Sequence, residues 1–331
     1  MHPQDTGADR GIYCGSDLTM NQVNLAANVV NEVKKAVVGK DDAVIKVLLA
    51  ILARGHILLE DIPGVGKTTM AIAFSKALGL QYNRVQFTPD VMPSDLTGFS
   101  LYNKGTGQME YQPGALLCNL FLADELNRAT SRTQSALLEA MEEGRVTVDG
   151  VSRPVPDPFL VIATQNPAGA SGTQLLPDSQ LDRFALRLSM GYPAPADELE
   201  LLQRKMRGDP MGSVEQVADR EQLAALREQV DRVFVDDEIL RYILRLVQAT
   251  RTHPGLAQGV SPRAAISVAA VSRSAAFLHG RDYVIPGDVK YVWVDAIAHR
   301  LVLPAGAAGE SGRAAQIAAE VLGSVRAPRL R

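Results

Sequence analysis

The sequence predicts an α/β protein in which a parallel five-stranded sheet, flanked by helices, is followed by an all-helical C-terminal domain. Three observations carry this prediction. A short apolar strand runs into a glycine-rich loop and then into a helix over residues 56–78. Further apolar runs of strand length are separated by helical segments, the pattern of parallel strands joined by crossover helices. After Pro193 and Pro195 no strand-like run follows and helical periodicity dominates.

Length and composition indicate a globular protein. The 331 residues are 46% hydrophobic, which is enough to build cores for about two domains. The 34 basic and 37 acidic side chains nearly cancel, so no overall field draws the chain to nucleic acid or to an anionic membrane. Composition therefore gives no support to nucleic acid as a partner.

Cysteine usage and hydropathy indicate a cellular compartment. The chain contains two cysteines, Cys14 and Cys118, which supports neither a disulfide framework nor a cysteine metal site. The first twenty residues contain no continuous apolar segment of the signal-peptide kind, and no stretch reaches the roughly 18 apolar residues of a membrane span. We expect a soluble, cytoplasmic protein without a membrane span, in which residues 1–16 form a flexible leader.

The elements of the first part of the chain follow from apolar spacing and from the residues that begin and end helices. Asp41 and Asp42 can begin a helix, whereas Gly39, Gly55 and Gly79 follow the last periodic residues of helices. The expected helices are 18–37, 41–53, 68–78 and 131–143, and the expected strands are 56–60, 82–87, 120–123, 159–164 and 185–190.

The second part of the chain is expected to be helical throughout. Its helices are predicted over 196–207, 219–230, 236–252, 262–279, 286–300 and 313–325. The expected division is therefore an α/β nucleotide-binding domain over 17–192 and a helical domain over 193–331.

The run from Asp61 to Thr69, DIPGVGKTT, has the composition of a phosphate-binding loop. A loop that leaves a strand and enters a helix points several backbone N–H groups into one concavity, where the helix dipole also favours an anion. Gly64 and Gly66 permit close approach, Lys67 can reach the β and γ phosphates, and the Thr68 hydroxyl can bind Mg²⁺. The usual pattern begins with Gly, where this chain has Asp61.

Two further strands are expected to deliver polar groups to the same edge of the sheet. The strand LFLA ends in Asp124 and Glu125, and the strand FLVIAT is followed by Gln165 and Asn166. We expect Asp124 to hold Mg²⁺ through its water shell, Glu125 to act as the base that polarises the attacking water, and Asn166 to orient that water. ATP and Mg²⁺ are thus the expected cofactors.

Two arginines complete the set of candidates. Arg183 follows a short helix in the sequence LDRF, and Arg263 lies at the start of a helix in SPRAA. An arginine that reaches a γ-phosphate only in an assembled state can stabilise transition-state charge and couple hydrolysis to assembly.

This order of motifs resembles that of the AAA+ ATPases, and more narrowly of the MoxR family. The similarity covers roughly residues 20–326. It is carried by VVGKDDAVIKVLLAILARGHILLEDIPGVGKTT (37–69), FLADELNRATSRTQSALLEAMEEGRVTVDG (121–150), FLVIATQNP (159–167), LLPDSQLDRF (175–184), SPRAA (261–265) and AAEVLGSV (318–325).

The resemblance implies a role for each candidate. Lys67 and Thr68 correspond to Walker A, Asp124 and Glu125 to Walker B, and Asn166 to sensor 1. Arg183 corresponds to an arginine finger that acts on a neighbouring subunit, and Arg263 to sensor 2 acting in its own subunit. The implied nucleotide-binding residues are Val37, Val38, Gly39, Pro63, Gly64, Val65, Gly66, Lys67, Thr68 and Thr69. Relatives often have Gln where this chain has Lys40.

The resemblance also implies two insertions and an assembly. A helix-2 insert is expected at about 90–112 and a hairpin insert at about 144–158, with its turn at Asp149 and Gly150. The implied protein is an AAA+ core with a helical lid, forming a homo-oligomeric and typically hexameric ring. Such proteins act like chaperones: they couple ATP hydrolysis to remodelling, maturation or metal-cofactor insertion of client proteins, often with a partner that has a von Willebrand A domain.

Two other functions share these motifs. A nucleic-acid motor of the same helix-2-insert clade is one, although near-neutral charge and 5% aromatic residues do not favour it. A chelatase-like motor subunit that drives metal insertion into a tetrapyrrole is the other.

Overall fold

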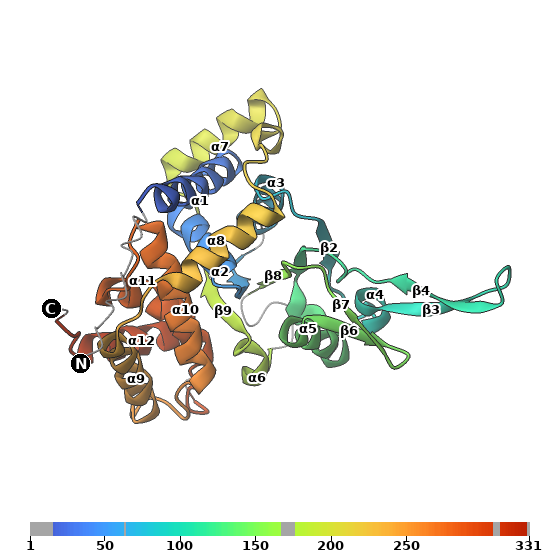
Figure 1. Cartoon of the computed structure of the whole chain (residues 1–331). Helices are drawn as coiled ribbons and strands as arrows, with labels where there is room; N and C mark the ends of the chain where they lie inside the picture. Colours follow the sequence, from blue (N-terminus) through green and yellow to red (C-terminus); the bar gives the residue numbers. More distant parts are fainter. Residues whose placement is uncertain (1–15, 63, 167–175, 307–311, 330–331) are drawn as a thin grey trace, which may run out of the picture.

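A computed structural model describes residues 16–62, 64–166, 176–306 and 312–329. Its centre is a five-stranded parallel sheet in the order β2-β5-β8-β1-β9 (Figure 1). The strands are β1 His56–Glu60, β2 Tyr82–Gln86, β5 Leu120–Asp124, β8 Leu160–Gln165 and β9 Phe184–Leu188. The predicted fold class, a parallel five-stranded sheet with flanking helices and a helical C-terminal region, is confirmed.

Helices cover both faces of the sheet, and the alternation of side chains along β5 shows how. Leu120 and Leu122 belong to the core beneath the first three long helices, whereas Phe121 and Ala123 belong to a second core beneath the helix that follows β5. A strand buried on both faces must be apolar at every position, which explains its continuous apolar run. These helices are α1 Ser16–Ala36, α2 Asp41–Leu52, α3 Lys67–Ala77 and α5 Ser131–Glu143.

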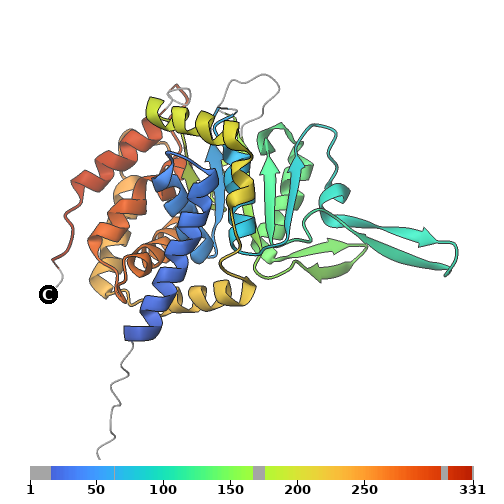
Figure 2. The same ribbon diagram turned by 90° about the horizontal axis from the view of Figure 1, so that it is seen from above.

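Two antiparallel hairpins extend from this core. After the short helix α4 Pro93–Thr97, β3 Gly98–Asn103 and β4 Gln108–Pro113 form a long hairpin that projects away from the body (Figures 1 and 2). The second hairpin pairs β6 Arg145–Val148 with β7 Val151–Pro154. Its turn residues Asp149 and Gly150 have φ values of 52° and 74°, as the tight turn predicted from the sequence requires.

The region after β9 is helical, as predicted. Its longer helices are α7 Pro195–Arg207, α8 Arg220–Arg232, α9 Asp237–Arg251, α10 Pro262–Leu278, α11 Pro286–Ile297 and α12 Arg313–Ser324. The short helix α6 Asp178–Leu181 precedes β9. Trp293 is fully buried, and its indole N–H donates to the carbonyl of Ala318 at 2.8 Å, which fixes α11 against α12.

The helical region packs directly against the β9 edge of the sheet. One continuous apolar core contains residues of α1, α2, β1, β9 and the C-terminal helices. Within the described ranges, no helix is both long enough and apolar enough to cross a membrane.

Candidate active site

The carboxyl ends of β1, β5 and β8 meet at one edge of the sheet and surround a cavity of about 280 Å³. This is where ligands bind in open parallel sheets, because the strand ends leave a crevice between their loops. Most of the predicted site residues are brought together here. The lining residues are Gly64, Gly66, Lys67, Thr68, Thr69, Asp124, Glu125, Thr164 and Asn166.

The phosphate loop wraps from β1 into α3, which begins at Lys67, one residue earlier than predicted. Gly64 and Gly66 have φ values of 87° and 96°, a left-handed conformation that glycine adopts without strain. The free N–H groups at the start of α3 therefore face the cavity and suit an anion. Pro63 lies outside the described residues.

Lys67 is buried beneath the loop, with 8% of its surface exposed. Its ammonium donates to the backbone carbonyl of Asp61. Burial lowers the pKa of Lys67, and the nearby carboxylates of Asp61, Asp124 and Glu125 oppose that shift. The hydrogen bond to the carbonyl of Asp61 thus holds the ammonium beside the loop, and a phosphate oxygen can replace that carbonyl as the acceptor.

Asp124 ends β5 with both carboxylate oxygens engaged. The hydroxyl of Thr164 donates to Oδ1 at 2.6 Å, and the guanidinium of Arg84 on β2 donates to Oδ2 at 2.7 Å. Thr164 also accepts the backbone N–H of Glu125 at 2.9 Å, so one hydroxyl fixes both acids.

Glu125 has φ 57° and ψ 45°, in the left-handed region that costs a residue with a Cβ about 1–3 kcal/mol. Its carboxylate accepts from Arg128 at 2.7 Å and from Asn166 at 3.3 Å. The hydrogen bond from Arg128, above all, lowers the pKa of Glu125, with Asn166 and Gln86 adding to the effect. Glu125 is therefore an anion at neutral pH.

Thr164, Arg84 and Arg128 were not among the residues predicted from the sequence. Thr164 carried a usable signal, because it is the polar residue at the end of an otherwise apolar strand. Arg84 carried none, because its contact with Asp124 depends on β2 pairing with β5. Arg128 follows Glu125 by three residues, and its contact requires the short 3₁₀ helix Leu126–Arg128.

The residues present fit a magnesium ion held mainly by nucleotide and water. Thr68 and Asp124 line the same cavity and offer hard oxygen ligands. Among the described residues no group of three His, Cys, Asp or Glu side chains could hold a metal alone. Mg²⁺ does not need such a cage, because it usually keeps several waters and binds one or two protein oxygens beside phosphate.

Arg183 and Arg263 lie elsewhere and share one carboxylate. Both guanidinium groups pair with Glu142, at 3.0 and 2.5 Å respectively. Glu142 is in the last turn of α5, next to Met141, whose carbonyl is 3.2 Å from the ring of His56 at the start of β1. The pair therefore lies at the amino edge of the sheet.

The role of Arg263 as sensor 2 within its own subunit stays a prediction, and in this structure the residue lies away from the cavity. The strand β1 is five residues long, so at roughly 3.3 Å per residue its first and last residues lie about 13 Å apart. The phosphate loop follows one end and the Arg263–Glu142 pair lies near the other. The sequence could place Arg263 at a helix start but could not show which edge of the sheet that helix faces.

The first three residues that the family resemblance implies in nucleotide binding, Val37, Val38 and Gly39, follow α1. Val37 and Val38 are buried, and Gly39 has a φ of 68°. Gly39 lies so close to α7 that a Cβ there would be 2.2 Å from a carboxylate oxygen of Asp197. These three residues do not line the 280 Å³ cavity. Lys40, the next residue, binds main-chain carbonyls after β9.

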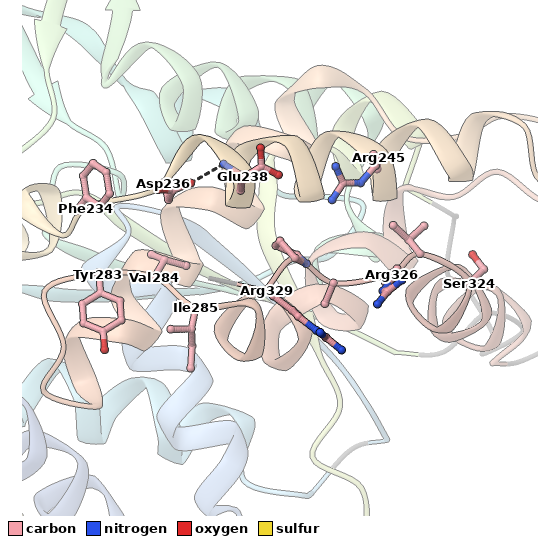
Figure 3. Close-up of a pocket in the computed structure, with 13 residues that line it drawn as sticks. Phe234, Asp236, Glu238, Arg245, Tyr283, Val284, Ile285, Ser324, Arg326 and Arg329 are labelled. Carbon is pink, nitrogen blue, oxygen red and sulfur yellow. Dashed lines mark hydrogen bonds between the residues drawn. The ribbon is translucent and has the colours of Figure 1, made fainter. Parts of the chain in front are cut away.

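A larger cavity, of about 1380 Å³, lies elsewhere among the described residues. It lies in the helical region among Phe234, Tyr283 and the chain after α12 (Figure 3). Arg245, Arg326 and Glu238 also line it, and none of the phosphate-loop or acidic residues of the sheet does. We therefore choose the candidate nucleotide site by the convergence of loop, acids and amide and not by cavity size.

Two family models and several known proteins match this chain. Residues 56–186 match the ATPase family associated with various cellular activities (AAA), and residues 248–321 match the AAA lid domain. The protein YeaC of Bacillus subtilis is 46% identical over 92% of this chain and 95% of its own length. Chaperone MoxR1 of Mycobacterium tuberculosis is 40% identical over 87% of this chain and 78% of its own.

A solved structure of a protein from Cytophaga hutchinsonii superimposes with a TM-score of 0.86 at 36% identity, covering 94% of this chain and 97% of the other. The sequence matches span both the α/β core and the helical region, and the relatives are covered over most of their length. Sequence, fold and site thus converge: this chain belongs to the MoxR family of AAA+ ATPases.

Proposed function

We propose that this ATPase hydrolyses Mg-ATP in a homo-oligomeric ring, with the hexamer as the expected form, and uses the energy to remodel or mature client proteins. One observation carries the proposal. The phosphate loop, both acids and Asn166 surround one cavity, whereas Arg183 and Arg263 lie together at the opposite edge of the sheet. A chain built in this way needs a second copy to supply arginine to its nucleotide.

The proposed mechanism assigns each described group a task. Lys67 leaves the carbonyl of Asp61 and binds the β and γ phosphates. Thr68 and Asp124 would hold Mg²⁺, which would supply charge neutralisation on the phosphate oxygens. Glu125 accepts a proton from the attacking water, and Asn166, which donates to Glu125 at 3.3 Å, keeps the carboxylate and the water in register. The two arginines of a neighbouring subunit stabilise the transition-state charge.

The client role is supported by a relative and by a surface. MoxR1 is named a chaperone. The β3–β4 hairpin exposes apolar side chains on both of its faces, Phe99 and Leu101 on one and Tyr102 and Met109 on the other, and such a projecting element suits contact with another protein. Insertion of a metal or cofactor, and help from a von Willebrand A domain partner, belong to the proposal only through the family resemblance.

Lys67→Ala tests the proposal at its base. In purified protein with Mg-ATP, the variant should lose hydrolysis to background, because no other described ammonium lines the cavity. Lys76→Ala is the matched control: this lysine also lies on α3 but donates to the carbonyl of Met211 outside the cavity. Equal phosphate release by Lys67→Ala and the unaltered protein would exclude this loop as the catalytic site.

A further inference from the structure

Asp61 occupies the first position of the phosphate loop, where the usual pattern has glycine. It is buried, with 7% of its surface exposed, and its carboxylate faces protein donors instead of water. Oδ1 accepts the N–H of Ile62 at 2.9 Å. Oδ2 accepts the N–H groups of Met190 and Gly191, each at 2.6 Å, and the hydroxyl of Ser189 at 3.1 Å. A glycine could make none of these side-chain contacts.

The residues that Asp61 binds form the connector between the sheet and the helical domain. We define the connector as residues 189–194, between the end of β9 and the start of α7. Gly191 in its middle has a φ of 59°, so the chain turns there in a conformation that favours glycine. Segments of this kind, short and at the end of an element, absorb the backbone changes when two domains move relative to each other.

A second side chain holds the same connector from the other direction. The ammonium of Lys40 donates to the carbonyls of Met190 and Tyr192, at 2.6 and 2.8 Å. The N–H groups of the connector are thus bound by an anion and its carbonyls by a cation. Charge-assisted hydrogen bonds of both kinds are stronger than neutral ones, so the connector is restrained at both sides of its backbone.

The connector also touches the loop that receives the phosphates. The Met190 methyl lies 3.8 Å from where a Cβ on Gly66 would stand. Asp61 itself bridges the two parts, because its carboxylate holds the connector while its carbonyl accepts the ammonium of Lys67. When Lys67 moves to a phosphate, the residue that loses this contact is the one that anchors the connector.

From this arrangement we propose that Asp61 is a positioning residue that couples the phosphate loop to the β9–α7 connector, so that nucleotide binding and the orientation of the helical domain depend on each other. The inference rests on the proposed nucleotide site. Such coupling is reciprocal: whatever the bound nucleotide does to the connector, the connector does to nucleotide affinity. Asp61 acts through Lys67 and the connector without itself reaching the phosphates.

Asp61→Gly provides the test, because it restores the usual loop residue and removes only the carboxylate. Backbone amide exchange of peptides that cover 186–195 would be followed by mass spectrometry with and without ADP, together with ADP affinity and kcat for Mg-ATP. In the unaltered protein, ADP should change exchange of the connector. In the variant, the connector should exchange faster without nucleotide and respond little to ADP, ADP affinity should shift by about fivefold or more because the coupling is reciprocal, and kcat should fall about tenfold.

Three further variants complete the experiment. Asp61→Asn keeps an acceptor for the connector without the charge and should restore part of the response to ADP. Lys40→Gln removes the ammonium from the connector carbonyls and should weaken the response without any change in the phosphate loop, which keeps the test valid if Asp61→Gly does not fold. Asp41→Asn, whose carboxylate pairs with Lys34 at an exposed site, is the matched control and should behave as the unaltered protein.

The outcomes separate the two proposals. Absence of ADP binding in the unaltered protein contradicts the nucleotide site itself. Normal binding, with the same ADP-dependent connector exchange and kcat in Asp61→Gly as in the unaltered protein, overturns the positioning role alone.

Discussion

Thr164 is the residue on which the geometry of both acids depends, since its one hydroxyl donates to Asp124 and accepts the N–H of Glu125. Thr164→Val keeps the shape but leaves that N–H and one carboxylate oxygen without their partner. If one such loss, of about 1–3 kcal/mol, is felt in the transition state, kcat should fall about 10- to 100-fold. ATP affinity should change little, because Lys67 and the loop are untouched. Steady-state kinetics and equilibrium nucleotide binding measure the two effects.

Thr164→Ser is the control for this prediction. It retains the hydroxyl and should recover most of the kcat lost in Thr164→Val. A valine variant as active as the unaltered protein would mean that Asp124 and Glu125 are positioned without this hydroxyl.

At the residue scale, the sequence could predict the groups whose positions follow from a strand end or a loop. Lys67, Asp124, Glu125 and Asn166 were predicted in this way and line, with Thr164, one cavity. Their roles remain predictions. Contacts that depend on pairing between distant strands, such as Arg84 with Asp124, leave no local pattern in the sequence. Asp61 was recognised as a departure, but its connector contacts span about 130 residues of chain.

At the scale of elements, the ring of His56 on β1 makes one hydrogen bond with β8 and one with α5. Together these two hydrogen bonds require the neutral ring. The N–H of Val161 donates to Nδ1 at 3.1 Å, so the ring proton lies on Nε2 and donates to the carbonyl of Met141. Burial lowers the pKa of His56 from 6.5 to about 4. A second proton would be on Nδ1 and would point at the N–H of Val161. Two donors that face each other cannot form a hydrogen bond.

Acid should therefore destabilise the protein partly through His56. Because the folded pKa lies below the unfolded value, the unfolded state binds more protons between about pH 6.5 and pH 4. The contribution of His56 is complete above pH 6.5 and is lost as the pH falls through this window, at a cost of about 1–3 kcal/mol. Urea unfolding at pH 7.5 and pH 5.0 measures this loss of stability.

The variant His56→Gln should be less stable at pH 7.5 but should lose less unfolding free energy between the two pH values. An equal loss in both proteins would assign the pH dependence to other groups.

Among the elements themselves, periodic helices and buried strands were predictable because each has a strong local pattern. The β3–β4 hairpin was anticipated only as an insertion, without its strands. Its apolar side chains do not mark a buried face, because Leu101, Tyr102 and Met109 are all more than half exposed. Without a buried face, a strand gives little signal in the sequence.

At the scale of the whole molecule, contacts with the helical domain position the segment that carries Arg183. Asp182, the residue before Arg183, accepts the hydroxyl of Ser261 at 3.0 Å and pairs with Arg300 at 3.2 Å. Arg300 is buried and also donates to the carbonyl of Phe184, the residue after Arg183. The short segment that carries Arg183 is therefore held by the helical domain of its own chain.

This arrangement leads to a prediction about assembly. Arg183→Ala should retain nucleotide binding, because Arg183 does not line the cavity, and should lose most hydrolysis if it acts on a neighbouring subunit. Loss of an arginine that contacts the transition state typically costs about 10³-fold or more in kcat. Glu142→Gln, which removes the carboxylate that both arginines share, should instead leave hydrolysis largely intact once a nucleotide phosphate takes its place.

Subunit mixing decides where Arg183 acts. Neither Arg183→Ala nor Glu125→Gln should hydrolyse ATP alone, but in a mixed ring a Glu125→Gln subunit can offer its intact Arg183 to a neighbour that has an intact Glu125. Mixtures of these two variants at varied ratios should therefore regain hydrolysis, with a maximum near equal amounts. The control is a mixture of Lys67→Ala with Glu125→Gln, which should stay inactive because no subunit in it has both an intact phosphate loop and an intact base. Mixtures of Arg183→Ala with Glu125→Gln that form normal rings but stay as inactive as either variant alone would contradict this prediction. Arg183 would then not act between subunits and would have to reach the nucleotide of its own chain from the opposite edge of the sheet.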